Sequence, residues 1–139
     1  MKNNHYLVLS SCSFLISVIY FICNFENNNF EILLALLILS NVIFSTLFWR
    51  KAKYKSIIHK FDGLFGKLSF ILVLCYVLLL KEDCSKYHKI IFIILTITAL
   101  LLFFISDKCS KKKWCSRKHI IIHSIFHLIT AICTLFAFI

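Results

Sequence analysis

Five long apolar runs, separated by short polar segments, dominate the pattern of this chain. An α-helix needs about 20 apolar residues to cross the hydrocarbon core of a bilayer. Long apolar runs without strict alternation of apolar and polar positions are not typical of strands, and inside a membrane a helix satisfies its own backbone hydrogen bonds. The chain is therefore expected to be a single transmembrane domain, an all-α bundle of five spanning helices. Their predicted ranges are residues 6–23, 30–49, 57–80, 90–105 and 119–139.

The composition agrees with a membrane protein and excludes several other classes. Of the 139 residues, 60% are hydrophobic, none is proline and two are glycine. Globular proteins are usually about 45–50% apolar, and a disordered chain, a collagen, a coiled coil or a disulfide-rich module would differ more strongly still. The net charge of +10 would suit a nucleic-acid partner in another setting. Here the basic residues stand between apolar runs, so the expected partners are membrane lipids and not nucleic acid.

Positive charge is concentrated in alternate loops. Lysine and arginine crowd the segments 50–60 and 108–118, which adjoin the same side of the bundle as Lys2. The opposite side carries Lys81, Lys86 and Lys89 together with acidic residues. By the positive-inside rule, the N-terminus is expected in the cytoplasm and the C-terminus outside.

The seven cysteines do not form a recognisable disulfide framework. Their number is odd, and Cys12, Cys75 and Cys133 lie inside apolar runs, where a thiol behaves as a small hydrophobic group. Cys109 and Cys115 lie in a basic segment expected on the cytoplasmic side, where thiols stay reduced.

Polar residues inside the predicted spans gather near one end of the bundle. Ionisable groups are costly in a membrane and are therefore candidates for function. The connectivity places the end of the second run and the starts of the third and fifth runs on the same side. The residues concerned are Ser45, His59, Asp62, His119, His123 and His127.

The three histidines of the last run repeat at intervals of four residues. This spacing puts neighbouring imidazoles on one helix face, as in other helical metal-binding pairs. His119 and His127 are about 12 Å apart along the axis, so one metal ion cannot easily take all three. His123 and His127 are therefore the expected ligand pair. The alternative is that these rings make hydrogen bonds to neighbouring helices or lie at the membrane interface.

Asp62 needs a partner at its predicted depth in the membrane. One alternative is a carboxylate at the N-terminal end of a helix, where the helix dipole stabilises negative charge. Gly63 follows Asp62 directly and Gly66 lies four residues after Asp62, which allows close helix approach or room for a small ligand. The candidate partners of Asp62 are a metal-bound water, His59, Lys60 and Lys67.

Together these residues resemble the signature of the CREST superfamily of membrane hydrolases. This group includes the alkaline ceramidases, the progestin and adipoQ receptors with their haemolysin III relatives, and the Per1-like proteins. Its members share Ser-x-x-x-His near the end of one helix, an Asp early in the next helix and His-x-x-x-His early in the last. Here Ser45, the segment Lys60–Gly66 and His123-Ser-Ile-Phe-His127 resemble these motifs, and Asp107 and Cys109 resemble the segment before the last one.

The resemblance implies a zinc-dependent hydrolase that cleaves an amide or ester bond of a lipid with an acyl chain. Members have seven helices and hold Zn²⁺ with three histidines, whereas five helices are expected here, and Trp49 stands at the position of the first motif histidine. The indole N–H is a donor only, so His59 is expected to be the third ligand beside His123 and His127. Zinc would then activate a water molecule, with Asp62 as proton acceptor and Ser45 orienting the water or the oxyanion.

Three other functions remain open from the sequence. Trp49 and the missing helices favour a non-catalytic membrane protein, such as a scaffold, a packing partner or a receptor-like remnant. Haem held between histidines of facing helices is a weaker option. A soft-metal site is the third, and its ligands would be Asp107, Cys109, Cys115 and His119.

Overall fold

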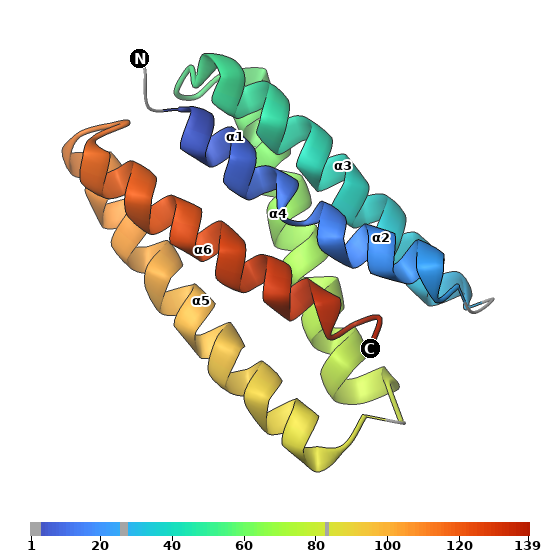
Figure 1. Cartoon of the computed structure of the whole chain (residues 1–139). Helices are drawn as coiled ribbons and strands as arrows, with labels where there is room; N and C mark the ends of the chain where they lie inside the picture. The colour runs from blue at the N-terminus through green and yellow to red at the C-terminus, as the bar shows by residue number, and fades with distance from the viewer. Residues whose placement is uncertain (1–3, 26–27, 83) are drawn as a thin grey trace.

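A computed structural model of the chain describes residues 4–25, 28–82 and 84–139. Within these ranges the structure is built from helices and contains no strand. Five helical segments are long and apolar enough to cross a membrane, which confirms the predicted fold class in these terms. The elements, shown in Figure 1, are α1 (His5–Cys12), α2 (Leu15–Cys23), α3 (Asn29–Lys51), α4 (Ile57–Cys75), the π-helical turn η1 (Tyr76–Leu80), α5 (Lys86–Lys112) and α6 (Arg117–Leu135).

The first predicted span is divided into two helices near Ser13. The Ser13 hydroxyl donates to the carbonyl of Ser10 at 2.6 Å, and the N–H groups of Ser13 and Phe14 bond to carbonyls three residues earlier. Serine side chains that form hydrogen bonds to the preceding turn bend helices. Backbone hydrogen bonds that span three residues instead of four tighten a helix locally. The local concentration of serines therefore explains why α1 and α2 are separate.

Side-chain caps set where the later helices begin. The hydroxyls of Ser56, Ser85 and Ser116 each accept a hydrogen bond from the backbone N–H three residues later, which satisfies one free donor in the first turn. Helix α5 is longer than the apolar run 90–105, because the polar residues on both sides of that run are also helical. Helix α6 ends at Leu135, and the last residues form turns instead of continuing the helix to residue 139.

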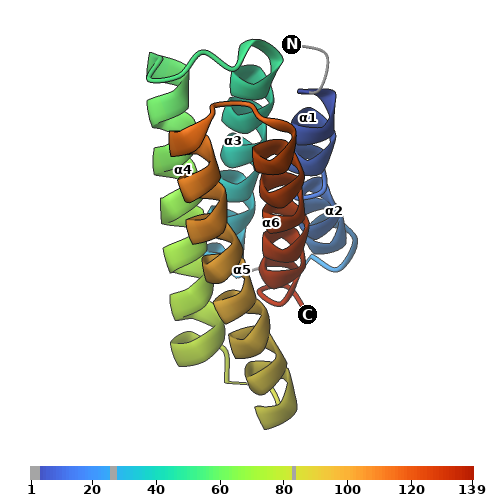
Figure 2. The same cartoon turned by 90° about the vertical axis from the view of Figure 1, so that its left-hand side faces the viewer.

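The helices form two hairpins. Helix α3 packs on α4, and α5 packs on α6, while α1 and α2 lie between α3 and α6 (Figures 1 and 2). Helices α4 and α5 hardly touch each other. The two hairpins are thus joined on one side by α1 and α2 and are separated on the other.

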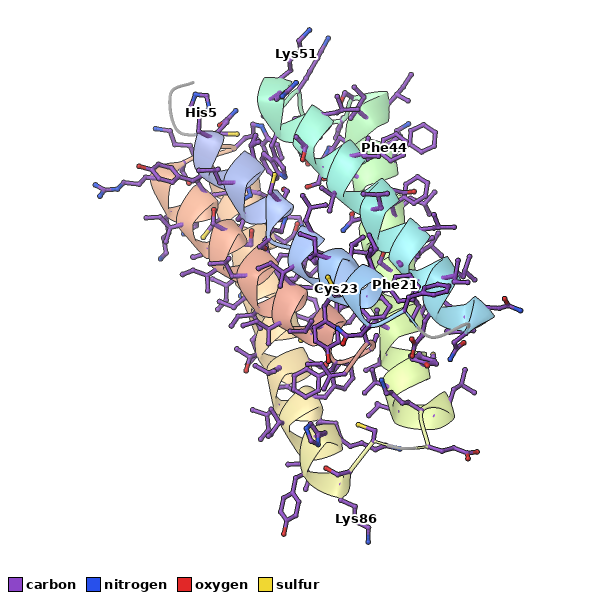
Figure 3. The ribbon with its side chains drawn as sticks, turned by 45° about the vertical axis from the view of Figure 1, so that its right-hand side comes forward. His5, Phe21, Cys23, Phe44, Lys51 and Lys86 are labelled. Carbon is purple, nitrogen blue, oxygen red and sulfur yellow. The ribbon has the colours of Figure 1, made fainter. Side chains whose placement is uncertain are left out.

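The two ends of the bundle differ in charge. The described N-terminal residues, the α3–α4 loop and the α5–α6 loop lie at one end, which we call the basic end because it carries Arg50–Lys55 and Lys111–Lys118. His5 and Lys51 mark this end and Lys86 the other in Figure 3. The outer helix faces between the two ends expose large apolar side chains, among them Ile71 and Leu101. Such surface suits lipid hydrocarbon better than water.

Candidate functional site

A cavity of about 390 Å³ lies between the two hairpins and reaches the basic end. Helices α3, α4, α5 and α6 all contribute to its wall. The structure brings all five sequence-predicted site residues together around this cavity: Ser45, His59, Asp62, His123 and His127.

The His127 ring is held by serines of α1. Its Nδ1 atom lies 3.0 Å from Ser10 Oγ and 3.4 Å from Ser11 Oγ. Both hydroxyls donate their single proton to the carbonyl of Leu7, at 3.1 and 2.8 Å. In the tautomer compatible with these two bonds, the serines act as acceptors and the proton of the neutral imidazole is on Nδ1. The Nε2 lone pair, on the other side of the ring, is therefore free to accept a hydrogen bond or bind a metal.

His123 is held in a similar way by a serine of α5, the helix that forms a hairpin with α6. Its Nδ1 atom lies 2.9 Å from the hydroxyl of Ser106 on α5. The His123 and His127 rings are neighbours on α6, with centroids 4.6 Å apart and planes at 64°. Two imidazoles, each fixed by a serine of a different helix, thus line the same part of the cavity.

Asp62 and Ser45 connect this histidine pair to the first hairpin. Ser45 Oγ lies 2.9 Å from Ser11 Oγ, and Ser45 of α3 and Asp62 of α4 both line the cavity. The contacts from His127 through Ser11 to Ser45 therefore join α6, α1 and α3 on the cavity wall that Asp62 shares.

His59 lies at the edge of the cavity and is engaged elsewhere. Its ring stacks on Phe48 with centroids 4.6 Å apart and planes at 7°. Its Nδ1 atom accepts a hydrogen bond from the backbone N–H of Lys55 at 3.1 Å. Within residues 4–25, 28–82 and 84–139, no three His, Cys, Asp or Glu side chains lie close enough together to hold a metal ion. The arrangement therefore offers two imidazoles to a metal and does not fit a three-ligand zinc site.

Trp49 occupies the space beside the histidine pair. Its side chain is 2% exposed, and its ring lies 5.1 Å from that of His123 and stacks on Trp114 at 5.9 Å. Among the residues that the structure describes, none forms a hydrogen bond with the buried Nε1 atom. The residue that replaces the first motif histidine thus lies next to the expected metal ligands, with its polar atom unsatisfied.

Trp114 closes the cavity at the basic end. Its indole N–H donates to the carbonyl of Ala52 at 3.1 Å, which joins the α5–α6 loop to the α3–α4 loop. Sequence reasoning missed this residue, and it also missed Ser10, Ser11 and Ser106. The serines of the first run are a visible polar interruption in an apolar segment, and this was the available signal.

The alternative soft-metal residues are not gathered into such a site. Asp107 pairs with Lys111 at 2.6 Å. Burial raises the pKa of the Cys115 thiol, which disfavours the thiolate that binds metals. Neither observation favours a soft-metal function.

Comparisons with known proteins give no relatives for this chain. No protein-family model matches it, and neither a curated protein nor a solved structure is similar enough to count as a match. The candidate function therefore depends on the cavity itself.

Proposed function

We propose that this protein is an intramembrane binding protein for an acyl lipid, which it holds in the cavity between the two hairpins. The observation that carries the proposal is a cavity whose wall combines hydrogen-bonded histidines and carboxylates with several large apolar side chains. Its volume of about 390 Å³ is within the usual range of small-molecule sites, about 300–1,000 Å³.

The wall of the cavity is amphipathic in the way an acyl lipid requires. The polar part includes Ser45, Asp62, His123 and His127, and it would take up the polar group of the ligand. The apolar part would cover the beginning of the acyl chain. It includes Phe14, Phe70, Leu100, Phe103 and Phe126.

The position of the cavity also favours a ligand from the bilayer. Because α4 and α5 hardly touch, the cavity wall is least tightly packed between these two helices, on the side opposite α1 and α2. A lipid could enter there without leaving the membrane. The basic loops favour an orientation with the N-terminus in the cytoplasm and the C-terminus outside, so that the cavity lies in the cytoplasmic half of the membrane.

Hydrolysis of a lipid amide or ester is the second candidate, and the free Nε2 atom of His127 favours it. A fixed imidazole lone pair and a carboxylate on the wall of one cavity are groups suited to moving a proton. In this proposal Asp62 accepts the proton of the attacking water and Ser45 orients that water. Zinc binding by His59, His123 and His127 stays a prediction, and we assign no step to a metal because only two of these ligands lie together.

The experiment follows binding and turnover together. The protein in lipid nanodiscs is incubated with a fluorescent N-acyl amide and the matched acyl ester, and bound lipid and released acid are both measured. Bound lipid that stays intact supports the binding function. Turnover that is lost in Asp62→Asn but kept in Asp107→Asn, a second carboxylate of the cavity wall, supports hydrolysis. If the protein retains neither compound above the level of empty nanodiscs, the proposal is wrong.

A further inference from the structure

Lys67 is a charged residue in the middle of an apolar helix. It lies ten residues after Ile57, the first residue of α4, which places it about 15 Å along the helix axis. A lysine at such a depth is costly, and groups of this kind are usually paired or functional. Among the described residues, Lys67 forms neither an ion pair nor a hydrogen bond. It nevertheless lines the cavity.

Lys67 and Asp62 lie on different sides of α4. At 100° per residue, their separation of five positions corresponds to about 140° around the helix axis. Both residues nevertheless line the cavity, and Lys67 is exposed. The positive and negative groups of α4 thus reach the cavity from different sides of the helix.

Space is available beside Lys67. Gly63 precedes it by one helical turn, and a Cβ atom added at Gly63 would meet nothing within 4 Å. Helix side chains lean toward the N-terminal end of their helix, so the stem of Lys67 leans over Gly63 toward the polar part of the cavity. An ammonium group with open space around it can approach a ligand.

The other acidic group facing this region is already matched. Asp107 of α5 also lines the cavity, but its carboxylate is 2.6 Å from the ammonium of Lys111. Among the described residues, Lys67 is therefore a positive charge of the cavity wall that has no ion-pair partner.

We infer that the ligand of this cavity is an acyl lipid with an anionic head group, and that Lys67 is the residue that pairs with it. This inference rests on the proposed lipid binding and specifies the class of lipid. The chemistry required is an anionic oxygen group at the end of an acyl chain. A fatty acid provides a carboxylate of this kind and a lysophosphatidate provides a phosphate.

The test compares ligands that share one chain and differ in the head group. Affinities of hexadecanoic acid, hexadecyl phosphate and hexadecanol are measured by competition with a fluorescent acyl probe in nanodiscs of neutral lipid. The wild-type protein is expected to bind one of the anionic compounds about tenfold more tightly than hexadecanol, since a charge-assisted hydrogen bond has this order of effect. The preferred anion identifies the source of the charge.

Matched variants locate the effect at Lys67. Lys67→Gln should abolish the preference for the anion and keep the affinity for hexadecanol, whereas Lys67→Arg should retain the preference. Lys60→Gln is the control, because Lys60 is an exposed lysine of the same helix that does not line the cavity. Equal affinity of the wild-type protein for acid, phosphate and alcohol would overturn the inference while leaving lipid binding intact. So would an equal loss of preference in Lys60→Gln. If the wild-type protein bound none of the three compounds, the proposed function itself would fail.

Discussion

The Nδ1 atom of His127 lies 3.0 Å from the hydroxyl oxygen of Ser10, although the two residues are 117 positions apart in the chain. This contact joins the first helix to the last and favours the tautomer in which Nδ1 carries the proton. The serine has given its own proton to the carbonyl of Leu7, so the ring presents its Nε2 lone pair on the opposite side. One packing contact between helices thus also sets the chemistry of the cavity.

The first prediction concerns this contact. Ser10→Ala should lower the free energy of unfolding and should show a coupling of about 0.6 kcal/mol with His127→Phe, the average for side-chain hydrogen bonds between membrane helices. Unfolding in mixed micelles with increasing SDS gives these values in a double-mutant cycle. Ser40→Ala is the matched control, since Ser40 bonds only to the carbonyl of Leu36 in its own helix. Strict additivity of Ser10→Ala and His127→Phe would contradict the assigned hydrogen bond.

The second prediction concerns the position of Trp49. Its ring lies 5.1 Å from that of His123, so a smaller imidazole at this position would face the histidine pair. Trp49→His is expected to bind zinc more tightly than the wild-type protein, because it adds a third nitrogen ligand. Zinc content after purification and competition with a chelator measure the change. Trp49→Phe removes the same indole without adding a ligand and should show no gain. An equal zinc content in all three proteins would contradict the proposed role of Trp49 in filling the third ligand position.

The third prediction uses the glycines of α4. Gly63→Ala should raise the free energy of unfolding by about 0.5–1 kcal/mol, because the added methyl group meets open space and alanine is favoured over glycine inside a helix. Gly63→Leu should extend into the cavity and weaken acyl-lipid binding severalfold without unfolding the protein. Lipid competition and SDS unfolding separate the two effects. Unchanged lipid binding in Gly63→Leu would show that the ligand does not use this part of the wall.

The fourth prediction tests the orientation in the membrane. In single-cysteine variants, a membrane-impermeant maleimide should label Cys84 from outside the cell and Cys109 only after the cytoplasmic side is exposed. Cys115 is a poorer reporter, because its raised pKa leaves less thiolate at neutral pH and its labelling should accelerate as the pH rises. Labelling of Cys109 from outside, with Cys84 protected, would reverse the topology.

The sequence predicted the five helical spans because apolar runs of this length have few alternatives in a membrane. It also predicted that Ser45, Asp62 and the histidines of α6 would meet at one end. That expectation needs only the parity of the helices, because each span returns the chain to the opposite side. Such properties depend on the order of segments and not on the details of packing.

The partners of these residues depend on packing and could not be predicted. Nothing in the spacing of Ser10 and His127 indicates that α1 lies against α6. The sequence placed His59 near Asp62, but stacking on Phe48 depends on how α3 and α4 cross. The separation of α4 from α5 arises because each helix packs on the other member of its own hairpin.

Photo-crosslinking tests most directly whether the cavity holds an acyl lipid. An acyl probe with a diazirine in its chain is activated in nanodiscs, and the labelled residues are mapped by mass spectrometry. We predict adducts on Phe70 and Phe126 of the cavity wall that excess unlabelled acyl lipid removes, while adducts on the outward-facing Leu101 persist. Adducts restricted to outward-facing positions, and insensitive to the competitor, would contradict lipid binding in the cavity.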